Sequence, residues 1–209
     1  MLTSTGPAHQ VSPSPASFEP YSRGLLLNHY IFGTDDVINV NRFGDVDQSL
    51  WYFQAPPAYL GNHGIAYQGT LSFTLGAFAG NFSQTNGNAL HLVELECAAC
   101  HGPVEMGIKL VFPLSKITPA FDGSPRVFSL ALSETAGWLK DSQNTAKPWG
   151  APTRCDMIQV LSRLSALRVL GDFTSWYESV ALDGVTLGNT QGQLPLCALQ
   201  QPDASVCLC

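Results

Sequence analysis

The stretch from Gln48 to Val93 contains no Asp, Glu, Lys or Arg. It is nevertheless rich in Gly, Pro, Asn, Gln and Ser, which the core of a bilayer would not accept, and no run reaches about 18 apolar residues. Uncharged segments rich in turn-forming residues are typical of short β-strands joined by tight turns. The sequence therefore predicts no membrane span and a β-rich fold.

Alternation of apolar and polar residues locates the strands. Leu71, Phe73 and Leu75 alternate with polar residues, so they would share the buried face of one strand. We interpret the segment 96–107 as a long hairpin loop and Asp156 as the N-cap of a short helix over 157–164. The expected strands are Trp51–Phe53, Leu71–Leu75, Leu90–Leu95, Ile108–Leu114, Val127–Leu132, Leu167–Phe173 and Val180–Leu187.

Composition limits the class of partner. The chain has 209 residues, of which 45% are hydrophobic, enough for one sizeable core. Only 12% are charged, and 10 Lys and Arg against 16 Asp and Glu give a net charge of −6. So few cations disfavour nucleic acid and anionic membranes as partners. Low surface charge also favours association with copies of the same chain in an assembly.

The two ends of the chain differ from its middle. Residues 1–20 are rich in Ser, Pro and Thr and predict a flexible arm. The main domain is expected over 21–195, and residues 196–209 hold three cysteines at the start of a Cys-rich unit. The first 17 residues lack the charged and apolar regions of a signal peptide. The chain is therefore either an internal fragment of a longer secreted protein or cytosolic.

Cysteine usage favours the secreted alternative. An even number of cysteines suggests disulfide pairing in an oxidising compartment, and the six candidates are Cys97, Cys100, Cys155, Cys197, Cys207 and Cys209. The spacing of Cys97 and Cys100 is also that of a zinc half-site, but no second pair with this spacing follows. We expect Cys97 to pair with Cys100, or one of them with Cys155. The sequon at Asn81 is a glycosylation acceptor if the chain is secreted.

Four segments together resemble one known family. They follow one another between about Leu50 and Leu187 and have the sequences WYFQAPPAYLGN with AYQGTLSF (51–62 and 66–73), FSLALSE with GW (128–134 and 137–138), DMIQVLSRL (156–164) and SVALDGV (179–185). Their order and content are similar to the laminin IV type A domain, also called the laminin B domain. The resemblance implies an all-β jelly-roll sandwich, related in shape to galactose-binding-like modules, with one short helix. It also implies an extracellular, non-catalytic, structural or adhesive role, and the Cys-rich tail resembles the EGF-like units that flank this module.

Catalysis is the weaker alternative. The five histidines fall in no catalytic motif. Glu94 and Glu96 lie on the same face of one strand and form a candidate carboxylate pair for a glycan-processing enzyme. Beside a long loop, however, we expect both carboxylates to be solvated.

Two kinds of binding site remain as candidates. Jelly-roll modules often hold a structural calcium ion with carboxylate ligands, for which the candidates are Asp35, Asp36, Asp45 and Asp47. Glycan binding needs exposed aromatic rings, for which the candidates are Trp149, Trp176 and Tyr177. Trp51 and Trp138 lie within strand signatures and are expected in the core. The function that we expect is an extracellular adhesion or assembly module for protein or glycan partners, with a calcium-dependent carbohydrate-binding module as the alternative.

Overall fold

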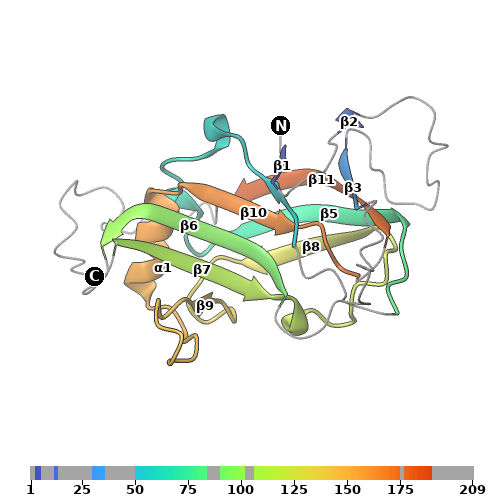
Figure 1. The fold of residues 1–209 in the computed structure, drawn as a ribbon. Helices are drawn as coiled ribbons and strands as arrows, with labels where there is room; N and C mark the ends of the chain where they lie inside the picture. Colours follow the sequence, from blue (N-terminus) through green and yellow to red (C-terminus); the bar gives the residue numbers. More distant parts are fainter. Residues whose placement is uncertain are drawn as a thin grey trace.

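Two antiparallel sheets packed face to face form the protein (Figure 1). The computed structural model describes residues 3–5, 12–13, 30–35, 50–83, 90–101, 106–174 and 177–189. Sheet A has the strand order β1 (Thr3–Thr5), β4 (Tyr52–Gln54), β10 (Ala166–Leu170), β6 (His91–His101), β7 (Met106–Pro113) and β9 (Leu139–Lys140). Sheet B has the order β2 (Ser12–Pro13), β3 (Ile31–Asp35), β11 (Glu178–Gly188), β5 (Thr70–Ala79) and β8 (Arg126–Ala131).

The connectivity is that of a jelly roll. Apart from the short strands β1, β2 and β9, each sheet has four strands, in the orders β4-β10-β6-β7 and β3-β11-β5-β8. The first of these strands thus pairs with the last, β3 with β11, and the second pairs with the second last, β4 with β10. This arrangement defines the jelly roll, and it confirms the predicted fold.

The core lies between the two sheets and holds the residues that alternation placed there. Leu71, Phe73 and Leu75 are fully buried, as predicted, and so are Trp51 and Trp138. Their burial removes large apolar side chains from water, which supplies most of the stability of such a sandwich.

Trp51 fills the space between Gly33 of sheet B and Gly171 beside sheet A. A Cβ on Gly33 of β3 would lie 2.5 Å from its ring, and one on Gly171, just after β10, would lie 2.0 Å from it. Neither distance is possible between real atoms, so only glycine fits at both positions. The Trp51 indole therefore fixes the spacing of the sheets at this point.

The end of β4 follows the sequence closely. Pro56 and Pro57 come directly after this strand, and Pro57 opens the 3₁₀ turn η1 (Pro57–Tyr59). Proline has no N–H to continue the ladder. Gly61 has a φ of 105°, as expected for a glycine in the turn that follows. Two further 3₁₀ turns are η2 (Gly64–Ala66) and η3 (Leu114–Lys116).

The helix begins three residues earlier than its sequence pattern predicted. α1 spans Arg154–Ser162, and its N-cap is Thr153 rather than Asp156. The Thr153 hydroxyl accepts from the Asp156 N–H, and the Asp156 carboxylate accepts from the Thr153 N–H. This is a capping box, in which Asp156 is the third helical residue. Both residue types are good N-caps, so the prediction took the wrong member of the pair.

The predicted hairpin loop over 96–107 is also wrong at its start. β6 runs on to His101 instead of ending near Leu95, and β7 begins at Met106. A shift in the β6–β7 register lies between Cys97 and His101. Cysteines three residues apart can bridge here because the strand is locally irregular.

The predicted domain limits stay predictions. Within 1–20, interpreted as a flexible arm, Thr3–Thr5 pairs with β4 and Ser12–Pro13 pairs with β3. Residues 196–209 lie outside the described part of the chain. In the part that is described, no helix has the length and apolar character needed to cross a membrane.

Candidate functional site

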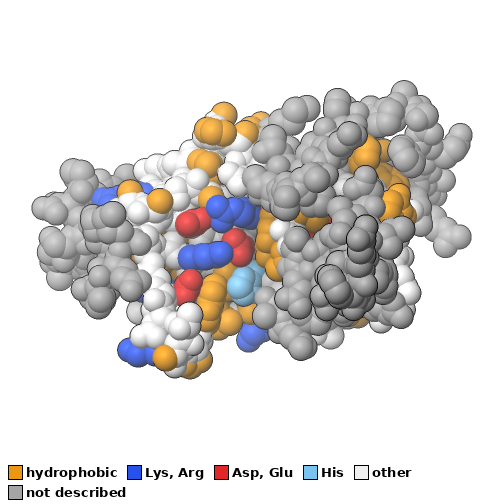
Figure 2. Space-filling view, viewed as in Figure 1, with side chains coloured by type: hydrophobic (Ala, Val, Ile, Leu, Met, Phe, Trp, Pro, Cys, Tyr) orange, Lys and Arg blue, Asp and Glu red, His pale blue; other side chains and the backbone are white. Residues whose placement is uncertain are grey.

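A band of charged side chains crosses the outer face of sheet A. It is formed by residues of three neighbouring strands, β7, β6 and β10, which we call the charge ladder: His91, Glu94, Glu96, Lys109 and Arg168. Figure 2 shows blue and red side chains alternating across this face. The alternation of β6 explains the placement, because Val93, Leu95 and Cys97 are buried toward the core and the glutamates between them point outward.

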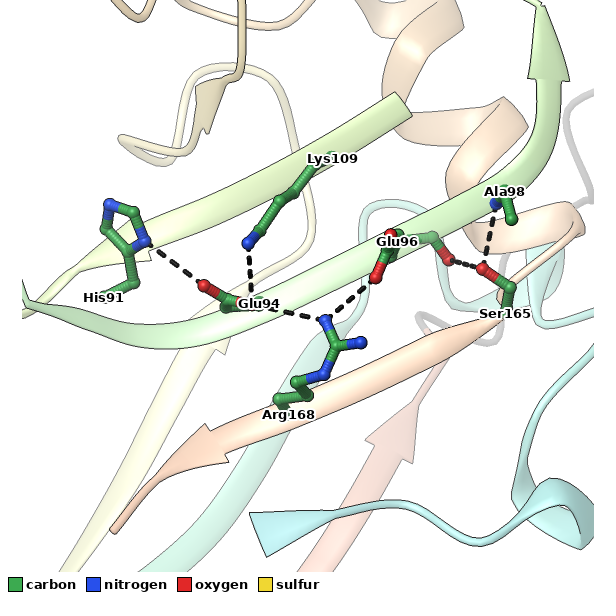
Figure 3. A network of polar contacts seen from close by, with 7 residues as sticks. All are labelled: His91, Glu94, Glu96, Ala98, Lys109, Ser165 and Arg168. Atoms are coloured by element: carbon green, nitrogen blue, oxygen red, sulfur yellow. Dashed lines mark hydrogen bonds and ion pairs between the residues drawn. The ribbon is translucent and has the colours of Figure 1, made fainter. Parts of the chain in front are cut away.

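The strand register brings opposite charges together. Glu96 lies opposite Lys109 on β7, and Glu94 lies opposite Arg168 on β10. Arg168 Nη1 donates to Glu96 Oε2 at 2.8 Å and to Glu94 Oε2 at 3.3 Å, and Lys109 Nζ lies 2.9 Å from Glu94 Oε2 (Figure 3). His91 Nδ1 lies 3.3 Å from Glu94 Oε1. Cross-strand pairs of opposite charge of this kind stabilise a sheet and fix its register.

Glu94 is the centre of the ladder. Contrary to the prediction, its carboxylate is not solvated but buried. Its side chain is only 8% exposed, whereas those of Lys109, Arg168 and Glu96 are 31%, 25% and 35% exposed. Burial alone would raise the pKa of Glu94. Hydrogen bonds from His91 and Lys109, with the charges of Lys109 and Arg168, outweigh burial and lower that pKa to about 2. The Glu94 carboxylate is therefore ionised at any physiological pH.

Backbone contacts hold one end of the ladder. The Ser165 hydroxyl donates to the Glu96 carbonyl at 2.9 Å and accepts from the Ala98 N–H at 2.9 Å. The Ser165 N–H donates to the same Glu96 carbonyl at 2.7 Å. Glu96 and the start of β10 are thus fixed relative to each other, as Figure 3 shows.

An aromatic ring lies at the other end of the ladder. Trp149, one of the predicted glycan-stacking residues, is half-buried, and its ring centroid lies 4.9 Å from that of His91. Tyr177 is exposed but directly precedes β11 of sheet B, so it belongs to another part of the sandwich. Trp176 lies outside the described residues.

Residues 52–198 match the model of the family described as Laminin B (Domain IV). The chain belongs to the laminin B (domain IV) family. This confirms the resemblance inferred from the four motifs, and it indicates an extracellular structural module.

A solved structure supports the same architecture. The laminin B sandwich is similar to the L4b domain of human laminin alpha-2, with a TM-score of 0.57 and 12% sequence identity over 79% of this chain and 82% of that chain. At such low identity the likeness shows the fold alone. A search of curated proteins finds no significant sequence match.

The laminin B sandwich has a second buried glutamate, which the sequence does not reveal. Glu178, the first residue of β11, is fully buried and accepts from the N–H groups of Phe173 at 2.8 Å and Thr174 at 3.1 Å. Burial and the neighbouring Asp172 charge raise the pKa of Glu178 to about 9, against the two backbone hydrogen bonds. A glutamate at a strand end gives no sequence signal of burial.

The calcium candidates remain a prediction. Asp35 ends β3, is buried, and lies opposite Glu178 in the ladder between β3 and β11. Asp36, Asp45 and Asp47 lie outside the described residues. Within the described ranges, no group of three or more His, Cys, Asp or Glu is arranged to hold a metal ion.

Three of the six cysteines lie among the described residues. Cys97 and Cys100 form a disulfide, one of the two predicted alternatives, so these sulfurs do not form the zinc half-site considered from their spacing. The Cys100 sulfur also contacts the Gln159 carbonyl of α1 at 3.5 Å. Cys155 is half-buried in the first turn of α1. Cys197, Cys207 and Cys209 lie outside the described residues.

Proposed function

We propose that this laminin B domain is a non-catalytic adhesion or assembly module that presents the charge ladder to a protein partner outside the cell. The charge ladder on sheet A carries the proposal. It places two cations and two carboxylates on one face, and its members are fixed by one another. Charged groups held in place in this way give a protein interface specificity and orientation more than raw affinity.

The same contacts argue against the carboxylate pair as catalytic groups. A glycosidase needs one carboxylic acid that keeps a proton near neutral pH. The pKa of Glu94 is lowered to about 2, and Arg168 Nη1 contacts both Glu94 and Glu96. A structural role of the pair accounts for its geometry better than a glycan-processing activity.

Binding of variants to purified matrix proteins tests the proposal. Glu96→Gln removes the most exposed carboxylate charge of the ladder and keeps a side chain of the same shape. It is expected to weaken binding to the matrix protein that the wild type recognises about tenfold, which corresponds to about 1.4 kcal/mol. Surface plasmon resonance at two salt concentrations measures the effect, which should shrink at high salt.

Val127→Ser is the matched control on the other sheet. Val127 lies on β8 of sheet B and is 53% exposed. Its substitution should leave binding unchanged. Equal affinities for the wild type and Glu96→Gln, or loss of binding in Val127→Ser alone, would reject the charge ladder as the binding face.

A carbohydrate-binding module is the second candidate, favoured by Trp149 beside His91 at the end of the ladder. An aromatic ring next to polar groups is the usual arrangement for stacking a sugar and bonding its hydroxyls. A glycan array probed with and without a chelator tests it, since a calcium ion at the candidates Asp35, Asp36, Asp45 and Asp47 would make binding calcium-dependent. Binding of no glycan, or equal binding by Trp149→Ala, would reject this candidate.

Two further alternatives have direct tests. Association with copies of the same chain, favoured by its 12% content of charged residues, predicts a concentration-dependent mass in sedimentation equilibrium. Turnover of a polysaccharide that is abolished by Glu94→Ala or Glu96→Ala would show a glycan-processing enzyme instead.

A further inference from the structure

The connection that follows β5 contains a candidate modification site, which lies apart from the charge ladder. β5 ends at Ala79, and Gly80 follows with a φ of 137°. Asn81 and Ser83 are exposed, whereas Phe82 between them is half-buried. Asn81-Phe82-Ser83 is the single Asn-x-Ser/Thr sequence of the chain in which x is not proline.

The side chains of Asn81 and Ser83 are bonded to each other. The Ser83 hydroxyl donates to Asn81 Oδ1 at 2.6 Å, and the Ser83 N–H donates to the same oxygen at 3.3 Å. This is an Asx turn, a local conformation that the three residues can form without the rest of the fold. The amide oxygen accepts from the serine, which makes the N–H groups on Asn81 Nδ2 more acidic.

Phe82 holds the turn against the core. Its ring packs edge-to-face on Phe121 at 5.2 Å between centroids and lies 6.1 Å from that of Phe173. A Cβ on Gly80 would lie 2.7 Å from the Phe82 ring, and one on Gly123 would lie 2.8 Å from it. The ring thus occupies a space that two glycines leave open, and the residues on either side of it face solvent.

We propose that Asn81 carries an N-linked glycan. In this transfer the Asn81 Nδ2 forms a bond to the anomeric carbon of an oligosaccharide, whose bond to a lipid diphosphate breaks. The lipid diphosphate leaves with the bonding electrons, and the amide nitrogen loses one proton. The donor is a lipid-diphosphate-linked oligosaccharide of the secretory pathway, so the proposal rests on the extracellular placement of the module.

The placement of Asn81 gives the glycan a clear position on the sandwich. Figure 1 shows the chain leaving β5 at the end of the molecule opposite α1. A bulky polar glycan there would keep this end from contacting a neighbouring protein. It would leave the other end, with α1 and the Cys97–Cys100 disulfide, uncovered.

Expression of the full chain behind a cleavable secretion signal in eukaryotic cells tests the proposal. Protein from cells and medium together is analysed by intact mass and by peptide mapping after release with a peptide amidase, which converts the glycosylated Asn81 to Asp. We expect most of the protein molecules to show a mass increase of one core oligosaccharide. Because Asn81 is exposed, an endoglycosidase should also release the glycan from the folded protein without denaturant.

Matched variants separate the sequon from the fold. Ser83→Ala and Asn81→Gln should abolish the mass increase, whereas Ser83→Thr should keep it. An unmodified chain in both cells and medium, or a glycan that survives in Ser83→Ala, would overturn the proposal. The binding role of the charge ladder is read separately, by Glu96→Gln on deglycosylated protein, so the failure of one proposal does not imply the failure of the other.

Discussion

Two buried glutamates, one in each sheet, respond to burial in opposite ways. Glu94 of sheet A has a pKa of about 2, and Glu178 of sheet B has a pKa of about 9. Burial pushes both values upward. The difference comes from the neighbours, because Lys109 and Arg168 face Glu94 whereas Asp172 faces Glu178. The charge of a buried carboxylate is thus set by the charged groups that lie around it.

The two glutamates also have different structural roles. Glu94 joins three strands side by side through ion pairs on the outer face of sheet A. Glu178 instead binds the backbone N–H groups of the segment that leads into its own strand, at Phe173 and Thr174. Removal of a partner should therefore cost most in sheet A, where a charge would be left buried.

Arg168→Ala should have the largest effect. It removes the cation that contacts both ladder carboxylates and leaves Glu94 buried with Lys109 and His91. Breaking a buried ion pair costs about 3–5 kcal/mol, and we expect about 3 because Lys109 remains. Urea denaturation followed by tryptophan fluorescence measures the change. A loss below 1 kcal/mol would mean that water replaces Arg168 at little cost.

The acid dependence of the ladder should be somewhat smaller. Since the folded pKa of Glu94 is lowered, its stabilisation is fully present above the unfolded pKa near 4.5 and is lost as pH falls toward 2. We expect the free energy of unfolding of the wild type to exceed that of Glu94→Gln by about 2 kcal/mol at pH 7 and to converge with it near pH 2. A pH-independent difference between the two proteins would contradict the assigned pKa.

Glu178→Gln should show the opposite dependence. Since the folded pKa of Glu178 is raised, its contribution is most favourable below pH 4.5 and is lost as pH rises toward 9. A glutamine resembles the neutral acid, but its Nε2 cannot accept one of the two backbone N–H bonds, so the variant should be less stable than the wild type by roughly 1 kcal/mol at pH 4, and this deficit should shrink at pH 8. Thermal unfolding at both pH values measures this. A deficit of the same size at both pH values would contradict the raised pKa of Glu178.

Ser129→Ala is expected to have the smallest effect. Ser129 is exposed on the outer face of sheet B, and its hydroxyl accepts from that of Ser72 across the strand pair at 3.3 Å. Exposed substitutions of this kind change stability by about 0.5 kcal/mol or less. The same urea titration as for Arg168→Ala gives the comparison. If Ser129→Ala lowered the free energy of unfolding about as much as Arg168→Ala, the outer faces of the two sheets would not differ in their contribution to stability.

Short sequence patterns predict the features of the fold that depend on residues close together in the chain. Alternation located the strands around Leu71–Leu75, and proline with glycine marked the end of β4, because both signals act within a few residues. The burial of Trp51 followed from its place in a strand signature. Its fit between Gly33 and Gly171 could not be foreseen, since these glycines come from opposite sheets.

The candidate site depended on partners far away in the sequence. Glu94 and Glu96 were correctly placed on one face of a strand, but Arg168 is 74 residues from Glu94 along the chain. Only the pairing of β6 with β10 brings it near, so the predicted solvation of Glu94 was wrong. The sequence makes Trp149 a candidate for glycan stacking, but its position beside His91 likewise depends on the fold.

The pairing of β3 with β11 has a mechanical consequence. Because these strands are antiparallel, the beginning of β3 at Ile31 lies beside the later part of β11, at Leu182. The backbone enters β3 and leaves β11 at Gly188 toward the same end of the sandwich. A stretching force applied through these two points would open the β3–β11 hydrogen bonds one after another, like a zipper, rather than loading them all at once. This strand pair would therefore separate at a lower force than one loaded in shear along its length.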